Sequence, residues 1–134
     1  MIANHDWSMR AGPQGDECCH NARLMGVAAP GQVIPVPYDF DFSGLVNAPY
    51  ATAPDVLDIA SVRQRLYRGY CIHSAQAMAA AAEMRAKKAE IIGVLSQIPG
   101  LDPRTRDSSA NYLNGFFNLI ATDESTAKAI RGCI

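Results

Sequence analysis

Two short stretches of the sequence concentrate the side chains that could do chemistry. The first contains Asp6 and, further along, Asn21, which comes directly before a run of β-type residues. The second contains Asp39 and Asp41, which come directly after another such run. Carboxylate and amide oxygens are hard ligands that suit Mg²⁺, and a separate aspartate beside them can accept the proton of an attacking hydroxyl. These residue types predict a site for phosphoryl transfer.

A pair of short strands is expected to bring these residues together. Arg23–Ala28 and Gln32–Tyr38 are β-type runs separated by a Pro-Gly turn, which predicts a β-hairpin. Asn21 precedes the first strand and Asp39 follows the second, so the two residues should meet at the open end of the hairpin. Asp6 leads into the loop that ends at the first strand, so it can reach the same place.

A simpler interpretation of the polar residues stays open. Aspartates such as Asp39 and Asp41 often cap turns by accepting hydrogen bonds from backbone N–H groups. His5 and His20 are expected to hydrogen-bond within loops rather than to bind a metal ion.

The second half of the sequence is rich in alanine and predicts helices. Ser61–Arg68 is expected to form two helical turns that end at Gly69, and a long helix is expected from Ser74 to Gln97. That helix should stop before the Pro-Gly pair at 99–100. Its predicted apolar stripe consists of Ala77, Ala81, Met84, Ile91, Leu95 and Ile98.

Two further helices are expected near the carboxyl terminus. Asp102 and Pro103 have the residue types favoured at the N-cap and at the first helical position. Thr122 or Asp123 should cap a last short helix. The predicted buried residues are Tyr112, Leu113, Phe116, Phe117 and Ile120 in the first of these helices, and Ala127 and Ile130 in the second.

Composition and charge are those of one folded domain. The chain has 134 residues, of which 49% are hydrophobic and 19% charged, with a formal net charge of −1. This balance gives no basic surface for nucleic acid, and no apolar run approaches the roughly 20 residues that a membrane helix needs. We expect an α+β fold that is mostly α, with a loop and β-hairpin segment over 1–60 and a helical bundle over 61–134. Neither nucleic acid nor insertion into a membrane is expected.

The pairing of the four cysteines stays open at this level. Neighbouring Cys18 and Cys19 are expected to be badly placed to bond each other, which leaves two pairings of them with Cys71 and Cys133. A bond between Cys71 and Cys133, with Cys18 or Cys19 paired upstream, is a third alternative, and four reduced thiols are a fourth. We favour Cys71–Cys133, because a bundle that returns its last helix to its first would bring these residues together.

The sequence also resembles a known group of proteins. The segments MIANHDWS, CCHN, VIPVPYDFDFSGLVNAPYA and SVRQRLYRGYC are similar to the C-terminal part of a family of uncharacterised bacterial proteins. Many members of that family begin with a secretion signal. The resemblance implies that the chain continues a missing N-terminal segment, which would be its partner, and that the protein is periplasmic or secreted.

More distantly, the order of the motifs is similar to that in the C-terminal lobe of atypical kinase-like enzymes, the CotH-like kinases among them. This resemblance implies that Asp6 is the catalytic base and that Asn21, Asp39 and Asp41 bind the metal ion. It implies Mg²⁺ and ATP as cofactors of the full-length protein. The isolated chain is expected to be inactive, because the lysine and the glycine-rich loop that clamp the nucleotide would lie upstream. The alternative is a non-catalytic extracytoplasmic protein that retains a kinase-like fold.

Overall fold

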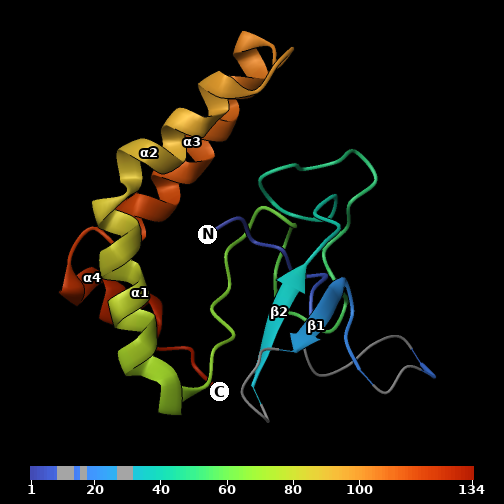
Figure 1. The fold of residues 1–134 in the computed structure, drawn as a ribbon, viewed down its shortest axis with the longest axis vertical. Coiled ribbons are helices and arrows are strands. Elements are labelled where there is room, and N and C mark those ends of the chain that lie inside the picture. Colours follow the sequence, from blue (N-terminus) through green and yellow to red (C-terminus); the bar gives the residue numbers. More distant parts are fainter. Residues whose placement is uncertain (9–13, 16–17, 27–31) are drawn as a thin grey trace. The chain divides into compact units, whose positions relative to one another are not determined.

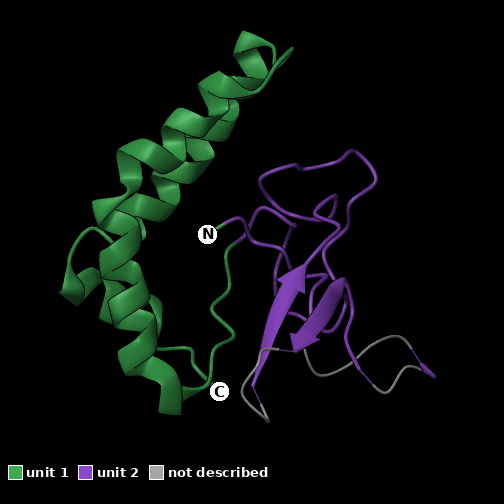
Figure 2. Cartoon of the chain, viewed as in Figure 1, with its two compact units in different colours: residues 1, 65–134 green, residues 2–64 purple. Residues whose placement is uncertain are grey.

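The computed structural model describes residues 1–8, 14–15, 18–26 and 32–134. Over these residues the fold is α+β, with two antiparallel strands and four α-helices (Figure 1). The chain forms two compact units (Figure 2). We name residues 2–64 the strand unit, and residues 65–134 together with Met1 the helical unit.

The predicted hairpin is confirmed in the strand unit. Strand β1 covers Ala22–Gly26 and strand β2 covers Val33–Pro37, and they pair antiparallel with Ala22 opposite Pro37 and Gly26 opposite Val33. The turn at 29–31, the predicted end of the first strand at 27–28 and much of the predicted loop at 8–20 lie outside the described residues.

Both prolines of β2 have their nitrogen atoms on the outer edge of the strand. Tyr38 N donates to Asn21 O at 2.9 Å, so the nitrogen at position 38 faces β1. Alternate residues of a strand face opposite edges, so the nitrogen atoms of Pro35 and Pro37 face away from β1. The outer edge therefore lacks two donors, which disfavours pairing with a further strand.

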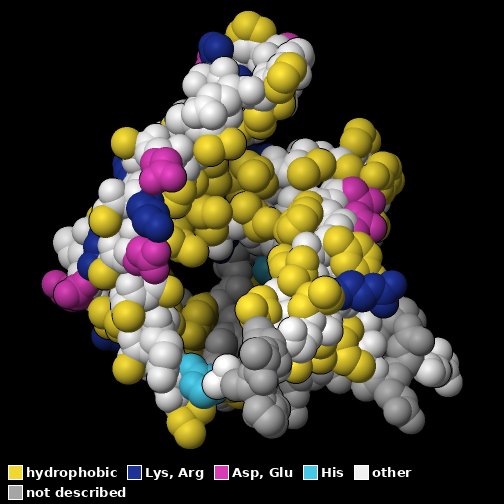
Figure 3. Space-filling model, viewed as in Figure 1, with side chains coloured by type: hydrophobic (Ala, Val, Ile, Leu, Met, Phe, Trp, Pro, Cys, Tyr) yellow, Lys and Arg dark blue, Asp and Glu magenta, His cyan; other side chains and the backbone are white. Residues whose placement is uncertain are grey.

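Hydrophobic side chains of the hairpin are exposed to solvent over both strands, as Figure 3 shows. They are Leu24, Met25, Val33, Ile34 and Val36. Since these side chains stay exposed among the described residues, the hairpin contributes little beyond Ala22 to the core of the strand unit.

The core of the strand unit is built around loops. Ala22, Ser43 and Val62 are almost fully buried, at 1%, 1% and 3% exposure. The amino-terminal segment runs along the loop after β2, because Gly44 N donates to Ala3 O at 3.0 Å and an isolated bridge joins Asn4 to Ser43. This pairing fixes the position of the residues that precede Asp6.

The prediction of a helix over Ser61–Arg68 is wrong. The segment makes only a turn, with Gln64 N donating to Ser61 O at 3.0 Å. A continuing helix would need the Gln64 carbonyl to accept from the backbone four residues later. No such bond is present among the described residues; His5 Nε2 lies 2.8 Å from that carbonyl, and the chain leaves the turn in an irregular conformation.

The helical unit contains four α-helices and two short 3₁₀ helices. The elements in order are η1 (Cys71–His73), α1 (Ser74–Ala86), α2 (Lys88–Gly93), η2 (Val94–Gln97), α3 (Pro103–Leu119) and α4 (Asp123–Ala129). The predicted long helix over 74–97 is thus interrupted at Lys87, where φ is −97° and ψ is 10°. Hydrogen bonds from Lys87 N to Glu83 O and from Ile91 N to Lys87 O bridge the interruption.

The core of the helical unit lies among α1, α2 and α3. Ala81, Phe117 and Ile120 form its buried centre, and partly buried residues pack around it, namely Met84, Ile91, Ile92 and Phe116. The predicted buried face of α3 is confirmed, with Phe116 only partly covered. The predicted stripe on the first helix fails at its far end, because Ile98 is 44% exposed.

Both predicted helix starts are confirmed. Asp102 Oδ1 accepts from Thr105 N at 3.0 Å, and Pro103 is the first residue of α3. Thr122 caps α4 through a reciprocal capping box with Ser125.

The predicted inward face of α4 is wrong at Ala127, which is exposed. Thr126 is fully buried in its place, because its hydroxyl donates to Thr122 O at 2.7 Å and accepts from Arg85 Nη1 at 3.1 Å. Ile130 is half-buried.

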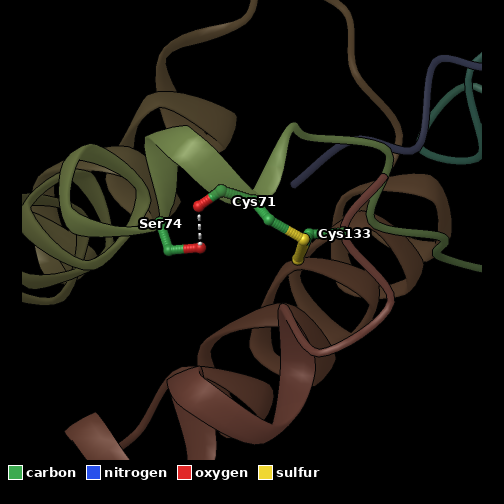
Figure 4. Close-up of a disulfide and its surroundings, with 3 residues drawn as sticks. All are labelled: Cys71, Ser74 and Cys133. Atoms are coloured by element: carbon green, nitrogen blue, oxygen red, sulfur yellow. Dashed lines mark hydrogen bonds between the residues drawn. A yellow bond between two sulfur atoms is a disulfide. The ribbon is translucent and has the colours of Figure 1, made fainter.

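The structure pairs Cys71 with Cys133, as favoured from the sequence (Figure 4). Their Cα atoms lie 5.0 Å apart, within the range that a disulfide requires. Backbone bonds from Cys71 N to Ile134 O and from Ile134 N to Gly69 O, both 3.0 Å, support the junction. Ser74 Oγ donates to Cys71 O at 2.8 Å and so ties the start of α1 to the same place.

The expectation for the other two cysteines is wrong. Neighbouring Cys18 and Cys19 are themselves paired, with Cα atoms 3.7 Å apart. Neighbours in an extended chain point to opposite sides, but the backbone at Cys19 is left-handed, with φ at 66°. The pairings of Cys18 and Cys19 with the two distant cysteines are therefore wrong.

Within the part of the chain that the structure describes, no helix combines the length and the apolar character needed to cross a membrane.

Candidate functional site

The carboxylate of Asp6 is held at both of its oxygen atoms. His20 Nε2 lies 3.0 Å from Oδ1, and Asn21 Nδ2 donates to Oδ2 at 2.9 Å. The same Asn21 nitrogen also donates to the backbone oxygen of Asp6 at 2.8 Å. The side chains of Asp6 and His20 are 35% and 36% exposed, so the group is oriented and still open to a solute.

Local sequence explains how Asp6 comes to this position. Asn4 Oδ1 accepts from Asp6 N at 3.2 Å. Asparagine favours this turn, in which its side chain bonds the backbone two residues further on. Ser8 and His20 then exchange two backbone hydrogen bonds, of 3.0 and 2.9 Å. Asn21 follows in a left-handed conformation, with φ at 52°, which asparagine tolerates better than most residues.

Asp39 lies beside this group at the end of β2. Asn4 Nδ2 donates to Asp39 O at 3.3 Å, so one asparagine contacts both Asp6 and Asp39. The Tyr38 N to Asn21 O hydrogen bond places the residue before Asp39 directly opposite Asn21. The φ of Asp39 is 58°, so the chain turns sharply as it leaves the strand.

Asp39, which is exposed, and Asp41, which is half-buried, form a pair of interacting carboxyl groups. Their shared side-chain hydrogen bond raises the pKa of Asp39 above its ordinary value, and the negative charges of Asp41 and Asp6 contribute in the same direction. The same bond lowers the pKa of Asp41, helped by Tyr50, whose hydroxyl donates to Asp41 Oδ2 at 3.0 Å. This bond to Asp41 in turn raises the pKa of Tyr50.

The convergence predicted at the open end of the hairpin is present in the structure. Asp6 and Asn21 are in direct contact, Asp39 follows the residue opposite Asn21, and Asp41 is bonded to Asp39. The residues come from segments far apart in sequence. Their roles in catalysis or metal binding stay predictions.

A small cavity opens next to Asp6. Its volume is about 180 Å³. It is lined by His5, Asp6, Phe42, Thr52, Pro54 and Val62. Pockets for drug-sized ligands usually measure roughly 300–1,000 Å³, so this cavity could take a small group but not a whole nucleotide.

The acidic residues could hold only a metal ion that needs few ligands from the protein. Among the described residues, no three or more His, Cys, Asp or Glu side chains are grouped so that they could hold a metal ion by themselves. Mg²⁺ needs less, because it usually binds one or two carboxylates and completes its shell with phosphate and water. Asp39 and Asp41 provide such a pair, so the residues fit Mg²⁺ carried in with a phosphate group.

Sequence reasoning missed several partners of these residues. His20 was expected to make a loop hydrogen bond but not to contact Asp6, although its position next to Asn21 was a signal. The Asn4-x-Asp6 spacing is the signal of a turn. Nothing in the sequence pointed to Tyr50. Trp7 is a further surprise, because its Nε1 is buried and finds no hydrogen-bond partner among the described residues.

Comparisons with protein-family models, with curated proteins and with solved structures give no match to this chain.

Proposed function

We propose that the chain is the C-terminal portion of a kinase-like phosphotransferase, and that the strand unit supplies the base and the Mg²⁺ ligands for phosphoryl transfer from ATP. The observation that carries the proposal is the convergence of Asp6, Asn21 and Asp39 at the open end of the hairpin. These are a candidate base, an amide ligand and a carboxylate ligand.

Asp6 is suited to accept the proton of an attacking hydroxyl. An ionised carboxylate has about four sites for hydrogen-bond donors, and His20 and Asn21 use one on each oxygen. The remaining sites stay open to a substrate hydroxyl, while the two bonds fix the direction of the group. A base that is already oriented loses little freedom when the substrate binds.

Asn21, Asp39 and Asp41 are suited to hold the cation. The Nδ2 of Asn21 is engaged by Asp6, which leaves its Oδ1 as the atom able to ligate. Asp39 and Asp41 add two carboxylates close to each other, the first exposed and the second half-buried. Mg²⁺ bound there would neutralise charge on the phosphate oxygens.

Binding of Mn²⁺, which is paramagnetic and has similar ligand preferences, tests the metal site. With ATP present, Mn²⁺ should broaden the NMR signals of Asn21, Asp39 and Asp41 at lower concentrations than the signals of other acidic residues. Asp39→Asn should abolish this preference, because it removes one of only two carboxylates. Asp55→Asn, which changes another exposed aspartate of the strand unit, is the matched control. Equal broadening at all acidic residues would contradict the proposal.

The alternative, a non-catalytic extracytoplasmic protein with a kinase-like fold, is favoured by one observation. Both cysteine pairs are at disulfide distance, and disulfides persist mainly in oxidising compartments, where ATP is not the usual phosphate source. Under this alternative, Mn²⁺ would show no preference for Asp39 over Asp55, and the acidic cluster would serve only to hold the loops together.

A further inference from the structure

Next to the candidate site lies a feature that the proposed function does not use, the bond between Cys18 and Cys19. The two residues directly precede His20 and Asn21, the pair that holds the Asp6 carboxylate. Cys18 is exposed and Cys19 is half-buried, so a small thiol can reach this disulfide from solvent.

The paired cysteines also constrain the backbone that leads into the site. Joining adjacent residues closes a ring that includes the peptide bond between them, and a ring this small admits few backbone conformations. Cys19 has φ at 66°, a region that L-residues other than Gly and Asn seldom occupy. Once the sulfur–sulfur bond is broken, nothing covalent keeps Cys19 in this conformation.

Movement at Cys19 would be passed directly to the next residue. The backbone of His20 is held to Ser8 by two hydrogen bonds, and its ring contacts Asp6 Oδ1. Both contacts depend on the direction in which the chain leaves Cys19. We propose that Cys18–Cys19 is a thiol–disulfide exchange site whose oxidised form clamps His20 and Asn21 onto Asp6, and whose reduced form releases them.

The reductant is a small dithiol or a protein dithiol. One thiolate of the reductant attacks Cys18 Sγ, the Cys18–Cys19 bond breaks, and Cys19 leaves as a thiolate that takes up a proton. The second thiol of the reductant then displaces Cys18 from the mixed disulfide. In total, two electrons and two protons pass to the cysteines, and the dithiol becomes a disulfide.

The idea that this disulfide regulates phosphoryl transfer rests on the proposed function. The idea that it holds His20 and Asn21 against Asp6 does not. Hydrogen exchange of backbone amides measures the clamp without any activity. In the oxidised chain, the amides of Ser8 and His20 should be protected by their mutual hydrogen bonds. After reduction with dithiothreitol, exchange at both positions should accelerate at least about tenfold.

The amides of Gly44 and Leu45 are the internal control, because they are bonded to Ala3 and Ile2 in the same unit. Their exchange should stay unchanged if the release is local. The double variant Cys18→Ser/Cys19→Ser cannot form the bond and should behave like the reduced protein even without reductant. Cys71→Ser/Cys133→Ser, which removes the other pair, should leave the amides of Ser8 and His20 protected.

Two results would overturn the inference. One is equal protection of Ser8 and His20 in the oxidised and reduced proteins. The other is alkylation of both Cys18 and Cys19, detected by mass spectrometry, in protein oxidised until Cys71 and Cys133 no longer react. A failure of Mn²⁺ to prefer Asp39 would contradict the proposed function alone, since the exchange experiment involves no metal ion.

Discussion

The two oxygen atoms of Asp6 have different partners, and this difference sets what each partner contributes. His20 is an ionisable ring at Oδ1, while Asn21 is a neutral amide at Oδ2 that also holds the Asp6 backbone. The amide therefore fixes both the side chain and the backbone of Asp6. The ring of His20 orients the other carboxylate oxygen.

Replacement of Asp6 tests its proposed role as base. In the proposed phosphotransferase, Asp6→Asn should lower the rate of phosphoryl transfer roughly 10²–10⁴-fold, the usual contribution of a positioned base. Asn keeps the shape and one oxygen, so the fold should stay intact. Asp58→Asn in the same unit is the control, and equal rates for wild type and Asp6→Asn, followed as ADP release, would exclude the role.

Asp102 gives a second prediction for a single residue. Its hydrogen bond with Thr105 at the start of α3 lowers the pKa of Asp102 below its ordinary value. A group whose pKa is lower in the folded state stabilises the fold at pH values above its unfolded pKa, and this contribution is lost as the pH falls through the folded pKa. The melting temperature of the helical unit should therefore fall more on acidification below about pH 4 in the wild type than in Asp102→Asn.

Asparagine can still cap the helix but carries no charge to titrate, so this variant separates the effect of the cap from the effect of the charge. Asp107→Asn changes an exposed aspartate in the same helix and should leave the acid dependence as in the wild type. Thermal melts followed by circular dichroism at 222 nm, at pH values from 6 to 2, give the melting temperatures of the wild type and of both variants. Parallel curves for wild type and Asp102→Asn would contradict the prediction.

At the scale of elements, α4 is attached to α1 by one arginine. Arg85 donates through Nη1 to Ile120 O at 3.0 Å and to Thr126 Oγ1 at 3.1 Å, and through Nη2 to Asp123 Oδ1 at 2.6 Å. A helix as short as α4 is marginal by itself in water, so its stability comes from such contacts and from its capping box.

Removal of this arginine should destabilise the helical unit. Arg85→Leu removes the shorter of the two hydrogen bonds that the buried Ile120 carbonyl accepts, leaving Thr126 Oγ1 at 3.5 Å as donor, and it removes one partner of Thr126, which is fully buried. The expected loss is about 1–3 kcal/mol in the free energy of unfolding, measured by urea denaturation.

Arg106→Leu is the matched control for that experiment. The Arg106 side chain contacts the exposed Asp107 at 3.4 Å, and surface changes of this kind usually stay within about 0.5 kcal/mol. Equal losses for the two variants would show that Arg85 does not attach α4.

At the scale of the whole molecule, each unit has its own bonds that join parts of the chain distant in sequence. The helical unit closes through Cys71 and Cys133, which are 62 residues apart in sequence. The strand unit closes through backbone bonds between the amino-terminal segment and the loop after β2. Changes to one closure should therefore affect mainly the unit that contains it.

Loss of the Cys71–Cys133 bond should lower the stability of the helical unit. A closed loop of this length removes unfolded-state entropy worth about 4 kcal/mol in the chain-entropy estimate, which is an upper figure. Cys71→Ser/Cys133→Ser should therefore lower the helical melting temperature in circular dichroism. Cys18→Ser/Cys19→Ser should not, and equal shifts for both double variants would contradict the prediction.

The sequence by itself determined the elements whose signals are local. Asp102 and Pro103 start α3, Thr122 starts α4, and the β-type runs form the hairpin, because caps, proline and side-chain alternation act within a few residues. The convergence of Asn21 and Asp39 follows from the hairpin itself, since an antiparallel pair brings its outer ends together.

Only the tertiary structure decided the features that depend on distant partners. The segment at 61–68 forms only a turn, and its Gln64 carbonyl contacts His5, 59 residues away in the sequence. Thr126 is buried where Ala127 was expected, because Arg85 reaches it from another helix. The pairing of Cys18 with Cys19 depends on a left-handed backbone at Cys19, which no local sequence pattern predicts. These features depend on tertiary contacts and backbone conformations that the sequence alone does not reveal.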